Sequence, residues 1–481
     1  MGRPADIALE QGGTLRQGDL AGLLRRSPVS VQPEASVRDA LGRMKDERVG
    51  TVVITEPVRG LPLGILTRQD VIDRVVLPGG GLDVPVAGVM TGGVVALPLT
   101  SSAHQARLAL ARHDLRHLIL LDAAGGFAGV VSRNDLYASR SLGTDDLVEA
   151  IRGAGSPDAL AAAAGRVREA ARVMVARGEG AAQVCEWIAI LNDLVVQVAI
   201  DLAELESELP LVRWCWLGFG SEGRLEQTLD TDQDNGLLFL PEDKADTEAL
   251  RARFLPFARR VNALLDQCGF PLCKGGVMAG NPAWCLSLAE WRGQFASWMC
   301  SASPSDLLNA TIFFDLRALC GDAGLAAALQ EWLLGAAGDN PLFLRFMAAN
   351  SLQAGPPLGR IRDFVVDRES GQLDLKRDGS RLFVDVARIH ALALRVADTS
   401  TAGRLRAAGA VFGWPEHEVS ACTEAFAFIQ QLRLRRQVAG AQEGSNRVSP
   451  DALSELERAF LKESFRQARR LQQKLQLRYQ L

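Results

Sequence analysis

The sequence predicts a multidomain α/β protein, and three observations lead to this expectation. At roughly 100–200 residues per domain, its 481 residues correspond to about three domains. Residues 36–56 and 102–122 repeat one pattern, an amphipathic helix followed by an apolar run rich in β-forming residues. Residues 212–217 form an apolar, aromatic run that is typical of a buried strand, whereas helical periodicity dominates the segment beyond residue 300.

The composition excludes several classes of protein. Hydrophobic residues make up 48% of the chain and charged residues 23%, which is the balance of a globular protein and not of a disordered one. The net charge of −4 argues against nucleic acid as the main partner. No apolar run reaches the roughly 18 residues of a membrane span, and the first residues lack the apolar core of a signal peptide. Eight cysteines without a CxxC pair fit a reducing compartment, so we expect a cytoplasmic protein without stable membrane insertion.

The N-terminal repeat continues past the helix and the apolar run. The strings GILTRQDV and GVVSRNDL begin at residues 64 and 129, an offset of 65 after the 66 of the preceding segment. Each predicts a short strand that enters a helix, with Thr67 or Ser132 as the N-cap. Asp70 and Asp135 lie three residues after these caps, which is typical of a capping box with Asp in place of Glu. The free N–H groups of such a helix start also suit an anion, and the Asp suits ribose hydroxyls.

This repeated unit resembles a pair of CBS motifs. The resemblance covers residues 15–141, with the repeats at about 27–77 and 86–140, and Val89-Met90-Thr91 is similar to the usual lead-in to the second motif. CBS pairs form compact modules that often bind AMP, ADP or ATP between their halves, and they commonly self-associate. The resemblance therefore implies an adenine nucleotide effector and a homodimer. It also implies four ligand contacts: Thr67, Asp70, Ser132 and Asp135.

A helical connector is expected next, over residues 142–210. Ser156-Pro157-Asp158 is a strong helix start, because it combines an N-cap Ser, a Pro at the first helical position and an early acidic residue. Gly178 and Gly180 would end this helix. A second helical pattern runs from Ala181 to Glu208, with apolar residues at spacings of three and four. We expect a helical hairpin that serves as a scaffold.

The most informative stretch runs from Leu211 to Leu240. Its first apolar run ends in a Gly-Ser turn at 220–221, and a second apolar run follows Asp232-x-Asp234. Because strand residues two apart share a face, the two carboxylates would project together. They would repel each other without a cation. Mg²⁺ (or Mn²⁺) suits them, because this hard ion is held by one or two carboxylates plus substrate phosphates.

The Gly-Ser turn predicts the phosphate side of the same site. Gly220 and Ser221 allow a close backbone approach and offer free N–H groups, and Arg224 one turn later can neutralise a triphosphate. Each feature alone has an ordinary explanation, namely a helix cap or a charged surface turn. Together they indicate metal-assisted attack on the α-phosphorus of a nucleoside triphosphate, with pyrophosphate as the leaving group.

The string GSEGRLEQTLDTDQDN resembles the signature of the polymerase-beta-like nucleotidyltransferases. Within them it is closest to the N-terminal domain of protein-PII uridylyltransferases, and it is similar to a bacterial family that couples this domain to CBS pairs. The resemblance extends through Gly275–Pro282 and Phe313–Arg317 into the C-terminal part, where Leu373–Lys376 and Arg433–Gln437 match without a chemical role. It implies transfer of a nucleoside monophosphate from a magnesium-bound triphosphate to an acceptor, expected to be a protein. The CBS pair would regulate the transfer.

Such transferases normally use a third carboxylate on a later element. Residues 271–284 contain no acid, and Asp315 is the alternative, because the related uridylyltransferases have an acid at the matching place. Asp315 could instead pair with Arg317 at a domain seam. Lys274 and Asn281 flank a Gly-rich loop and could line a nucleotide pocket, although Gly-Gly and Asn-Pro also mark turns.

The expected organisation has five parts in chain order. These are a tail (1–14), the CBS pair (15–141), the helical connector (142–210), the nucleotidyltransferase domain (211–300) and a C-terminal helical domain (301–481). Within the last part, Ser303-Pro304 and Ser449-Pro450 look like helix starts.

Two other functions stay open. The first is a non-catalytic nucleotide sensor that acts through a partner; the complete Asp-x-Asp argues against it, and the uncertain third carboxylate argues for it. The second is a membrane-associated regulator. The last helix carries an apolar stripe opposite basic residues, which suits a membrane surface. Packing of that stripe onto the helical domain is the alternative explanation.

Overall fold

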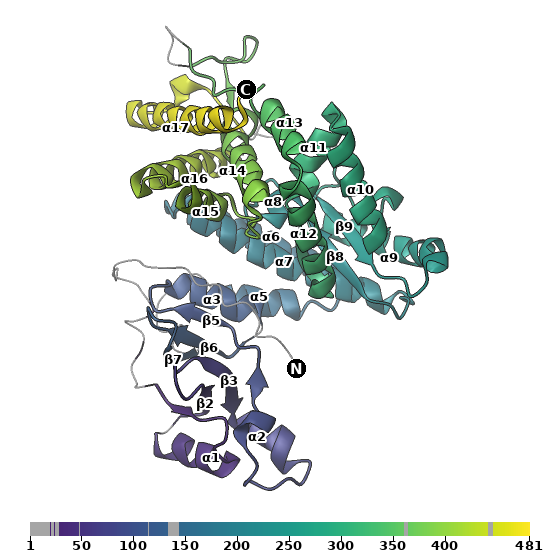
Figure 1. Cartoon of the computed structure of the whole chain (residues 1–481), viewed down its shortest axis with the longest axis vertical. Coiled ribbons are helices and arrows are strands. Elements are labelled where there is room, and N and C mark those ends of the chain that lie inside the picture. Colours follow the sequence, from purple (N-terminus) through teal and green to yellow (C-terminus); the bar gives the residue numbers. More distant parts are fainter. Residues whose placement is uncertain are drawn as a thin grey trace. The chain divides into compact units, whose positions relative to one another are not determined.

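The computed structural model describes residues 20, 24, 28–47, 49–113, 115–132, 144–359, 364–440 and 446–481. The chain divides into two compact units, Met1–Asp145 and Asp146–Leu481 (Figure 1). Both contain helices and strands, as the sequence predicts. Among the described helices, none combines the length and the apolarity that crossing a bilayer requires.

The N-terminal unit consists of two similar halves. The first has a sheet of order β1-β2-β3-β4, and the second has a sheet of order β5-β6-β7. The strands are β1 (Ser30–Val31), β2 (Thr51–Thr55), β3 (Pro62–Thr67), β4 (Thr91–Gly92), β5 (Ala96–Pro98), β6 (His117–Leu121) and β7 (Phe127–Ser132). The helices are α1 (Val37–Asp46), α2 (Arg68–Val71), η2 (Ile72–Val76), η3 (Val86–Gly88) and α3 (Ala103–Arg112), and α5 (Thr144–Arg152) spans the boundary between the units.

The strand register confirms the internal repeat. In the first half Ser30 pairs with Val53 in parallel, and in the second half Ala96 pairs with Ile119 in the same way, each partner shifted by 66 residues. The next strand pairs antiparallel in both halves, and its partner shifts by 65 residues, from Thr67 to Ser132. The difference of one residue in the intervening loop is therefore real.

The C-terminal unit is built on a four-stranded sheet of order β10-β9-β8-β11. Its strands are β8 (Trp214–Gly218), β9 (Asn235–Phe239), β10 (Cys285–Ser287) and β11 (Arg317–Gly321). Both faces of the sheet are covered by helices. Trp214 and Trp216 of β8 pack their rings against Phe257 of α9 (Thr247–Gln267). Cys215 and Leu217, which alternate with them, belong to a core that includes Trp291 of α10 (Leu288–Ser301).

The position of β11 differs from the expected organisation. This strand pairs antiparallel with β8, with Arg317 opposite Gly218, so it completes the sheet. The sheet therefore extends past the expected domain boundary at residue 300 into a segment that we expected to be mostly helical. The strand was missed because its five residues, RALCG, lack both an apolar run and clear alternation.

The helical connector has the predicted form. α6 (Pro157–Ala176) begins with Ser156 as its N-cap and Pro157 in its first turn, and it packs against α7 (Ala181–Leu205). The C-terminal helices are α8 (Gly220–Gly223), α11 (Pro304–Phe313), α12 (Ala323–Gly338), α13 (Pro341–Ser351), α14 (Arg381–Leu394), α15 (Thr401–Phe412), α16 (Glu416–Val438) and α17 (Glu455–Tyr479). Shorter pieces are η4 (Lys244–Asp246), η5 (Pro282–Trp284), η6 (Lys376–Ser380), η7 (Pro450–Ala452) and the two-stranded sheet of β12 (Leu373–Asp374) and β13 (Arg447–Val448).

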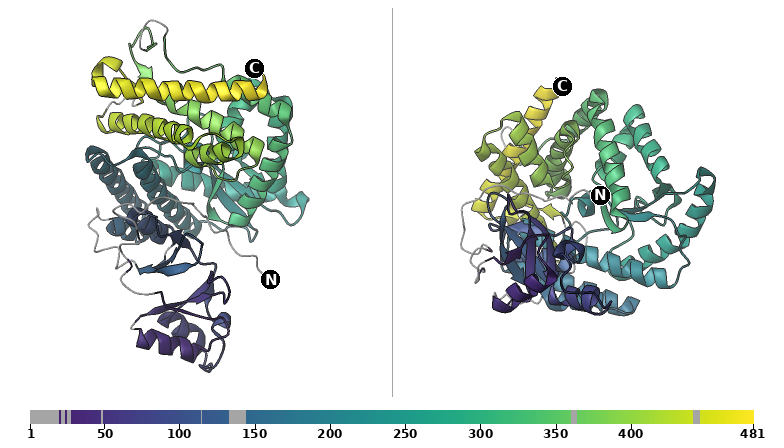
Figure 2. Two further views of the ribbon diagram at one scale, coloured as in Figure 1. Left: turned by 60° about the vertical axis from the view of Figure 1, so that its left-hand side comes forward. Right: turned by 60° about the horizontal axis from the view of Figure 1, so that its bottom comes forward.

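The apolar stripe of the last helix is packed inside the protein. α17 lies alongside α16 (Figure 2), and the five stripe residues are at most 1% exposed: Leu461, Phe465, Ala468, Leu471 and Leu475. This favours packing over attachment to a membrane surface. Ser449-Pro450 starts only the short turn η7, and α17 itself begins after Ser454, which forms a capping box with Glu457.

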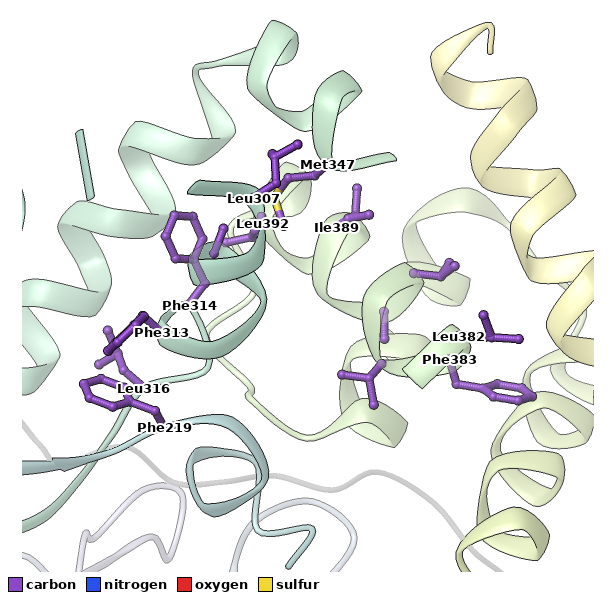
Figure 3. Packing of buried hydrophobic residues seen from close by; sticks show 14 of the residues in the cluster. Phe219, Leu307, Phe313, Phe314, Leu316, Met347, Leu382, Phe383, Ile389 and Leu392 are labelled. Carbon is purple, nitrogen blue, oxygen red and sulfur yellow. The ribbon is translucent and has the colours of Figure 1, made fainter. Parts of the chain in front are cut away.

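One hydrophobic core joins the sheet to the C-terminal helices. Figure 3 shows its close packing, with Phe219 and Phe313 next to each other and Leu382 and Phe383 on α14. The ring centroids of Phe219 and Phe313 are 4.8 Å apart. Because the core is continuous, the expected nucleotidyltransferase and helical domains form one compact unit.

Candidate active site

The loop after β8 brings the Gly-Ser turn to the acidic pair. Phe219 caps the short helix α8, and its buried ring packs on Phe313 and Trp291, which anchors the loop. The backbone N–H of Phe219 donates to the carbonyl of Asp234 at 2.8 Å. Gly220 has φ of +55°, and a Cβ at this position would lie 3.2 Å from Oδ2 of Asp234. Glycine therefore permits both the left-handed backbone and the close approach.

The sequence had suggested that Asp232 and Asp234 open the second strand. They instead precede β9, which begins at Asn235. The expected alternation nevertheless holds. Gln233 turns inward and donates to the backbone carbonyls of Asn262 at 3.0 Å and Phe270 at 2.9 Å. Asp232 and Asp234 face the opposite way, and both line one cavity together with Gly220 and Ser221.

The two carboxylates lack a cationic partner. In the part of the chain that the structure describes, neither Asp232 nor Asp234 forms an ion pair, and Asp234 accepts a weak hydrogen bond from the thiol of Cys273 at 3.6 Å. Burial and the nearby charge of Asp232 raise the pKa of Asp234 to about 7. Two adjacent acids that destabilise each other's charge fit a divalent cation. The described residues contain no group of three metal-ligating side chains, so substrate oxygens would have to complete the coordination of such an ion.

Basic side chains also line this cavity, which has a volume of about 450 Å³. They come from the C-terminal helices and η6 and are called the basic wall here: Lys376, Arg377, Arg381, Arg388 and Arg433. Two acids of the same segments, Asp374 and Asp385, line the cavity as well. Lys376 and Arg224 are close enough to Asp234 to oppose the increase in its pKa. The cavity thus brings carboxylates and cations together, which suits a metal-bound polyphosphate.

Arg224 lines the cavity and is held in place by two acids. Its Nε donates to Glu226 at 2.7 Å and its Nη1 donates to Asp315 at 2.6 Å, and only 12% of the side chain is exposed. Its guanidinium is therefore fixed in orientation before any ligand arrives.

Asp315 is not brought to the acidic pair. It is fully buried and does not line the cavity, and its two oxygens accept hydrogen bonds from Arg224, Arg388 and Arg404. Although burial acts to raise its pKa, these three charges hold the pKa well below its usual range. The alternative prediction, an ion pair between Asp315 and Arg317, is also wrong, because Arg317 pairs with Asp193 at 2.7 and 2.8 Å.

Lys274 also lies outside the cavity lining, and its side chain is exposed. Asn281 acts as a turn residue: it caps η5 and donates to the carbonyl of Gly276 at 3.0 Å. Cys273, which directly precedes Lys274, lines the cavity instead. The explanation of the Gly-rich loop as turns is therefore the one that the contacts favour.

The basic wall was missed by the sequence analysis. Leu373–Lys376 and Arg433–Gln437 stood out only as matching segments, yet Lys376 and Arg433 line the cavity. The available signal was the basic run KRDGSR at 376–381, which follows a short apolar strand. Only packing over a long sequence distance reveals that this run faces the Asp-x-Asp.

In the N-terminal unit, Thr67 and Asp70 form the expected capping box. A carboxylate oxygen of Asp70 accepts from the backbone N–H of Thr67 at 2.9 Å and from its hydroxyl at 2.6 Å. Asp70 also lies 3.2 Å from Arg74. Ser132 ends β7 opposite His117, and Asp135 lies outside the described residues. Capping thus accounts for the first copy of the motif.

Comparison with known protein families matches nearly the whole chain. Residues 165–305 match the family described as "Putative nucleotidyltransferase DUF294", and residues 341–479 match its "Putative nucleotidyltransferase substrate binding domain". Residues 18–77 and 86–140 match the CBS domain. The acidic loop of the cavity lies in the first of these segments, and the basic wall lies in the second.

Two curated relatives each match about a quarter of the chain. The CBS domain-containing protein YhcV of Bacillus subtilis (strain 168) is 29% identical over 111 residues, which are 23% of this chain and 77% of YhcV. The uncharacterized protein MK0525 of Methanopyrus kandleri is 24% identical over 123 residues, 25% of this chain and 62% of MK0525.

Solved structures match a similar share of the chain. The CBS domain protein PAE2072 from Pyrobaculum aerophilum, complexed with AMP, is 28% identical and covers 25% of this chain and 92% of its own, with a TM-score of 0.24. The CBS-domain containing protein ATU1752 from Agrobacterium tumefaciens is also 28% identical and covers 26% of this chain and 100% of its own, with a TM-score of 0.23. The family matches at residues 165–305 and 341–479, together with the CBS match, show that the chain belongs to the DUF294 nucleotidyltransferase family in a form that carries a CBS pair.

Proposed function

We propose that this protein transfers a nucleoside monophosphate from a magnesium-bound nucleoside triphosphate to an acceptor, and that the acceptor is a protein. One observation carries the proposal: two carboxylates without an ion-pair partner among the described residues, Asp232 and Asp234, line the same cavity as a set of basic side chains. A metal-bound triphosphate needs both, because the carboxylates hold the cation and the basic groups neutralise the phosphates.

The predicted site residues that line the cavity each have a role in this reaction. Asp232 and Asp234 hold Mg²⁺ or Mn²⁺, which when bound would polarise the reacting phosphate and stabilise the leaving pyrophosphate. Gly220 and Ser221 contact phosphate oxygens; the hydroxyl of Ser221 lines the cavity and donates no hydrogen bond to another described residue. Arg224, whose orientation is fixed by Glu226 and Asp315, adds a positive charge to the cavity.

Asp315 supports this site and does not belong to its metal-binding set. It holds Arg224 of the acidic side and Arg388 of the basic side through the same buried carboxylate. We therefore assign Asp315 a positioning role. Although Asp230 lines the same cavity, no third acid of the described residues groups with Asp232 and Asp234 into a set of three metal ligands. This observation favours the alternative function, a nucleotide sensor that binds without turnover.

The CBS pair is proposed to bind an adenine nucleotide, to regulate the transfer, and to mediate a homodimer. The duplicated strand register and the presence of both units in one chain support this view. Titration calorimetry with AMP, ADP and ATP would test binding, and light scattering would test the dimer. Regulation is refuted if a nucleotide that binds the CBS pair leaves the transfer rate unchanged.

The decisive experiment is label transfer from each of the four α-labelled ribonucleoside triphosphates, with magnesium, in an extract of the source organism. The full chain is compared with the double variant Asp232→Asn, Asp234→Asn. The matched control is Glu242→Gln, Asp243→Asn, which removes two exposed acids just past the other end of β9. We expect label on a macromolecule with the wild type and the control, and none with the double variant. If triphosphate binds but label never depends on the Asp pair, the sensor function is correct.

A further inference from the structure

Arg433 differs from the other buried arginines. Three arginines of the described residues are buried, and two of them, Arg388 and Arg404, bond directly to carboxylates. Arg433, on α16, is 7% exposed and lines the cavity, yet all its hydrogen-bond partners are neutral. Those partners are Asn446 at 2.8 Å, Ser380 at 3.5 Å and the side-chain carbonyl of Gln430.

The acids whose charges act on Arg433 are bound to other groups. Asp374 and Glu226 oppose the decrease in its pKa, but neither forms a hydrogen bond or an ion pair with Arg433. Asp374 accepts from the backbone N–H groups of Lys376 at 2.9 Å and Arg377 at 2.8 Å. Glu226 is bound by Arg224 at 2.7 Å and by the backbone N–H of Thr401 at 2.7 Å. A buried cation without a counter-charge is costly, so the site would gain from an anion.

Arg433 keeps its charge and has donors left. Burial lowers its pKa to about 10, so the guanidinium stays protonated at neutral pH. Its Nε and Nη1 make the three bonds above, whereas Nη2 donates none to any residue that the structure describes. A planar guanidinium with free N–H groups matches the geometry of phosphate oxygens.

We propose that Arg433 forms an anion-binding subsite of the cavity, which takes a phosphoryl group of a substrate. This inference rests on the proposed function and extends it to the part of the cavity that α16 lines. Arg224 acts electrostatically on both Asp234 and Arg433. The phosphoryl group is either the terminal phosphate of the nucleoside triphosphate or a phosphate carried by the acceptor.

The test uses the full chain without magnesium and the variant Arg433→Gln. The control is Arg435→Gln on the same helix, which removes an exposed guanidinium paired with Glu457. Tripolyphosphate serves as the probe, and binding is measured by calorimetry. We expect Arg433→Gln to weaken binding on the order of 10- to 100-fold, because a charged hydrogen-bonding partner is lost. The control should bind like the wild type.

A thermal unfolding scan without ligand separates this role from a structural one. If the charge of Arg433 is compensated only when an anion is bound, the substitution should leave the melting temperature of the ligand-free protein unchanged or raise it, since an uncompensated buried charge disappears. If Arg433 only supports the fold, the variant should melt lower and still bind tripolyphosphate normally. That result would overturn the inference.

Two further arms identify the source of the phosphoryl group. If it is the terminal phosphate, the wild type should prefer tripolyphosphate to pyrophosphate, and Arg433→Gln should lose the preference. If it belongs to the acceptor, the variant should instead lose the binding of inorganic phosphate to protein already saturated with tripolyphosphate. Unchanged affinities for all three anions would overturn the inference.

The failure of this inference can be told apart from the failure of the proposed function. The double variant Asp232→Asn, Asp234→Asn should keep its metal-free anion binding while it loses label transfer. Normal anion binding by Arg433→Gln, together with label transfer that depends on the Asp pair, would refute the subsite alone. Anion binding that depends on Arg433, without any label transfer, would refute the transferase alone.

Discussion

Asp315 balances the charge of three arginines from a position without solvent contact. The three guanidiniums come from α8, α14 and α15, and Asp315 lies between α11 and β11. Desolvation makes each of these charges costly, and only their mutual attraction offsets that cost. The carboxylate of Asp315 therefore stabilises the fold through its ion pairs with these arginines and not by itself.

We expect Asp315→Asn to lower the free energy of unfolding by about 3–5 kcal/mol, because Arg404 loses its carboxylate partner and Arg224 and Arg388 each lose one of two. Urea unfolding would measure the change. Asp322→Asn is the control, since it removes a partly exposed pair with Arg213 and should cost about 0–1 kcal/mol. Equal, small effects of the two substitutions would show that the buried cluster does not hold the unit together.

His390 is a buried titratable group on α14. It is 1% exposed, and neither ring nitrogen forms a hydrogen bond with the described residues. Its ring packs edge-on against Phe412 and Trp414, with centroids 5.2 and 5.5 Å away. Burial, followed by the charges of Arg478 and Lys474, lowers its pKa to about 4.

This depressed pKa predicts a loss of stability in acid. Between about pH 6.5 and 4 the unfolded chain binds a proton at His390 that the folded chain does not, so stability falls as the pH falls. His390→Phe removes the group and keeps a ring in the core. Relative to wild type, we expect the variant to gain about 2 kcal/mol of unfolding free energy at pH 5 compared with pH 7.5.

Urea unfolding at the two pH values measures this gain. The other titrating groups are the same in both proteins, so their contributions cancel in the difference. A difference between variant and wild type that does not change with pH would contradict a neutral, buried His390.

At the scale of elements, α17 shows how one helix separates packing from solvation. Its apolar stripe lies in the core, while Leu477 near its end is 80% exposed. Cations of the same helix contact aromatic rings, with Lys474 4.8 Å from the ring centroid of Trp414. The basic residues thus help to attach the helix to its own domain.

The two faces of α17 should respond differently to the same substitution. Leu471→Ala empties a site that is 1% exposed and should cost about 2–5 kcal/mol of unfolding free energy. Leu477→Ala, on the same helix, should change it by less than about 0.5 kcal/mol. Chemical denaturation of both variants would compare them. Similar losses would mean that Leu477 is covered in solution, for example by a second copy of the chain.

Elements with local signals were predictable from the sequence, and elements set by distant partners were not. The helix starts at Ser156 and Ser303 and the capping box of Thr67 depend on contacts within three residues. β11 depends on pairing with a strand about a hundred residues earlier, and its own residues carry little signal.

The candidate site likewise combines features with a local sequence signal and features that depend on distant residues. The Gly-Ser turn and the Asp-x-Asp follow one another in the chain, and the β8–β9 pairing brings them together as predicted. The buried ion pairs of Asp315 join residues 73 and 91 positions apart, so no local pattern could indicate them. The sequence singled out the carboxylates as candidates, whereas the basic wall forms only when distant segments pack together.

At the scale of the whole molecule, one hydrophobic core and the Asp232–Asp234 cavity of the C-terminal unit both draw on the sheet and on the helices that follow it. The sheet and the helices share that core, and they also share the cavity. Neither half of the unit therefore contains a complete candidate site. The N-terminal unit has its own smaller cores, which include the residues Val53, Ile119 and Leu121 from both CBS halves.

This shared cavity has a consequence for the order in which the ribosome makes the protein. Asp234 and Arg433 are 433 − 234 = 199 residues apart. At about 5–20 residues per second, the interval between them lasts roughly 10–40 s. During that time the nascent chain has its acidic loop but lacks the helix that carries Arg433. A chain whose translation stops in this interval keeps the Asp-x-Asp but lacks the part of the cavity that α16 lines, so the complete cavity belongs only to a chain that has been made past Arg433.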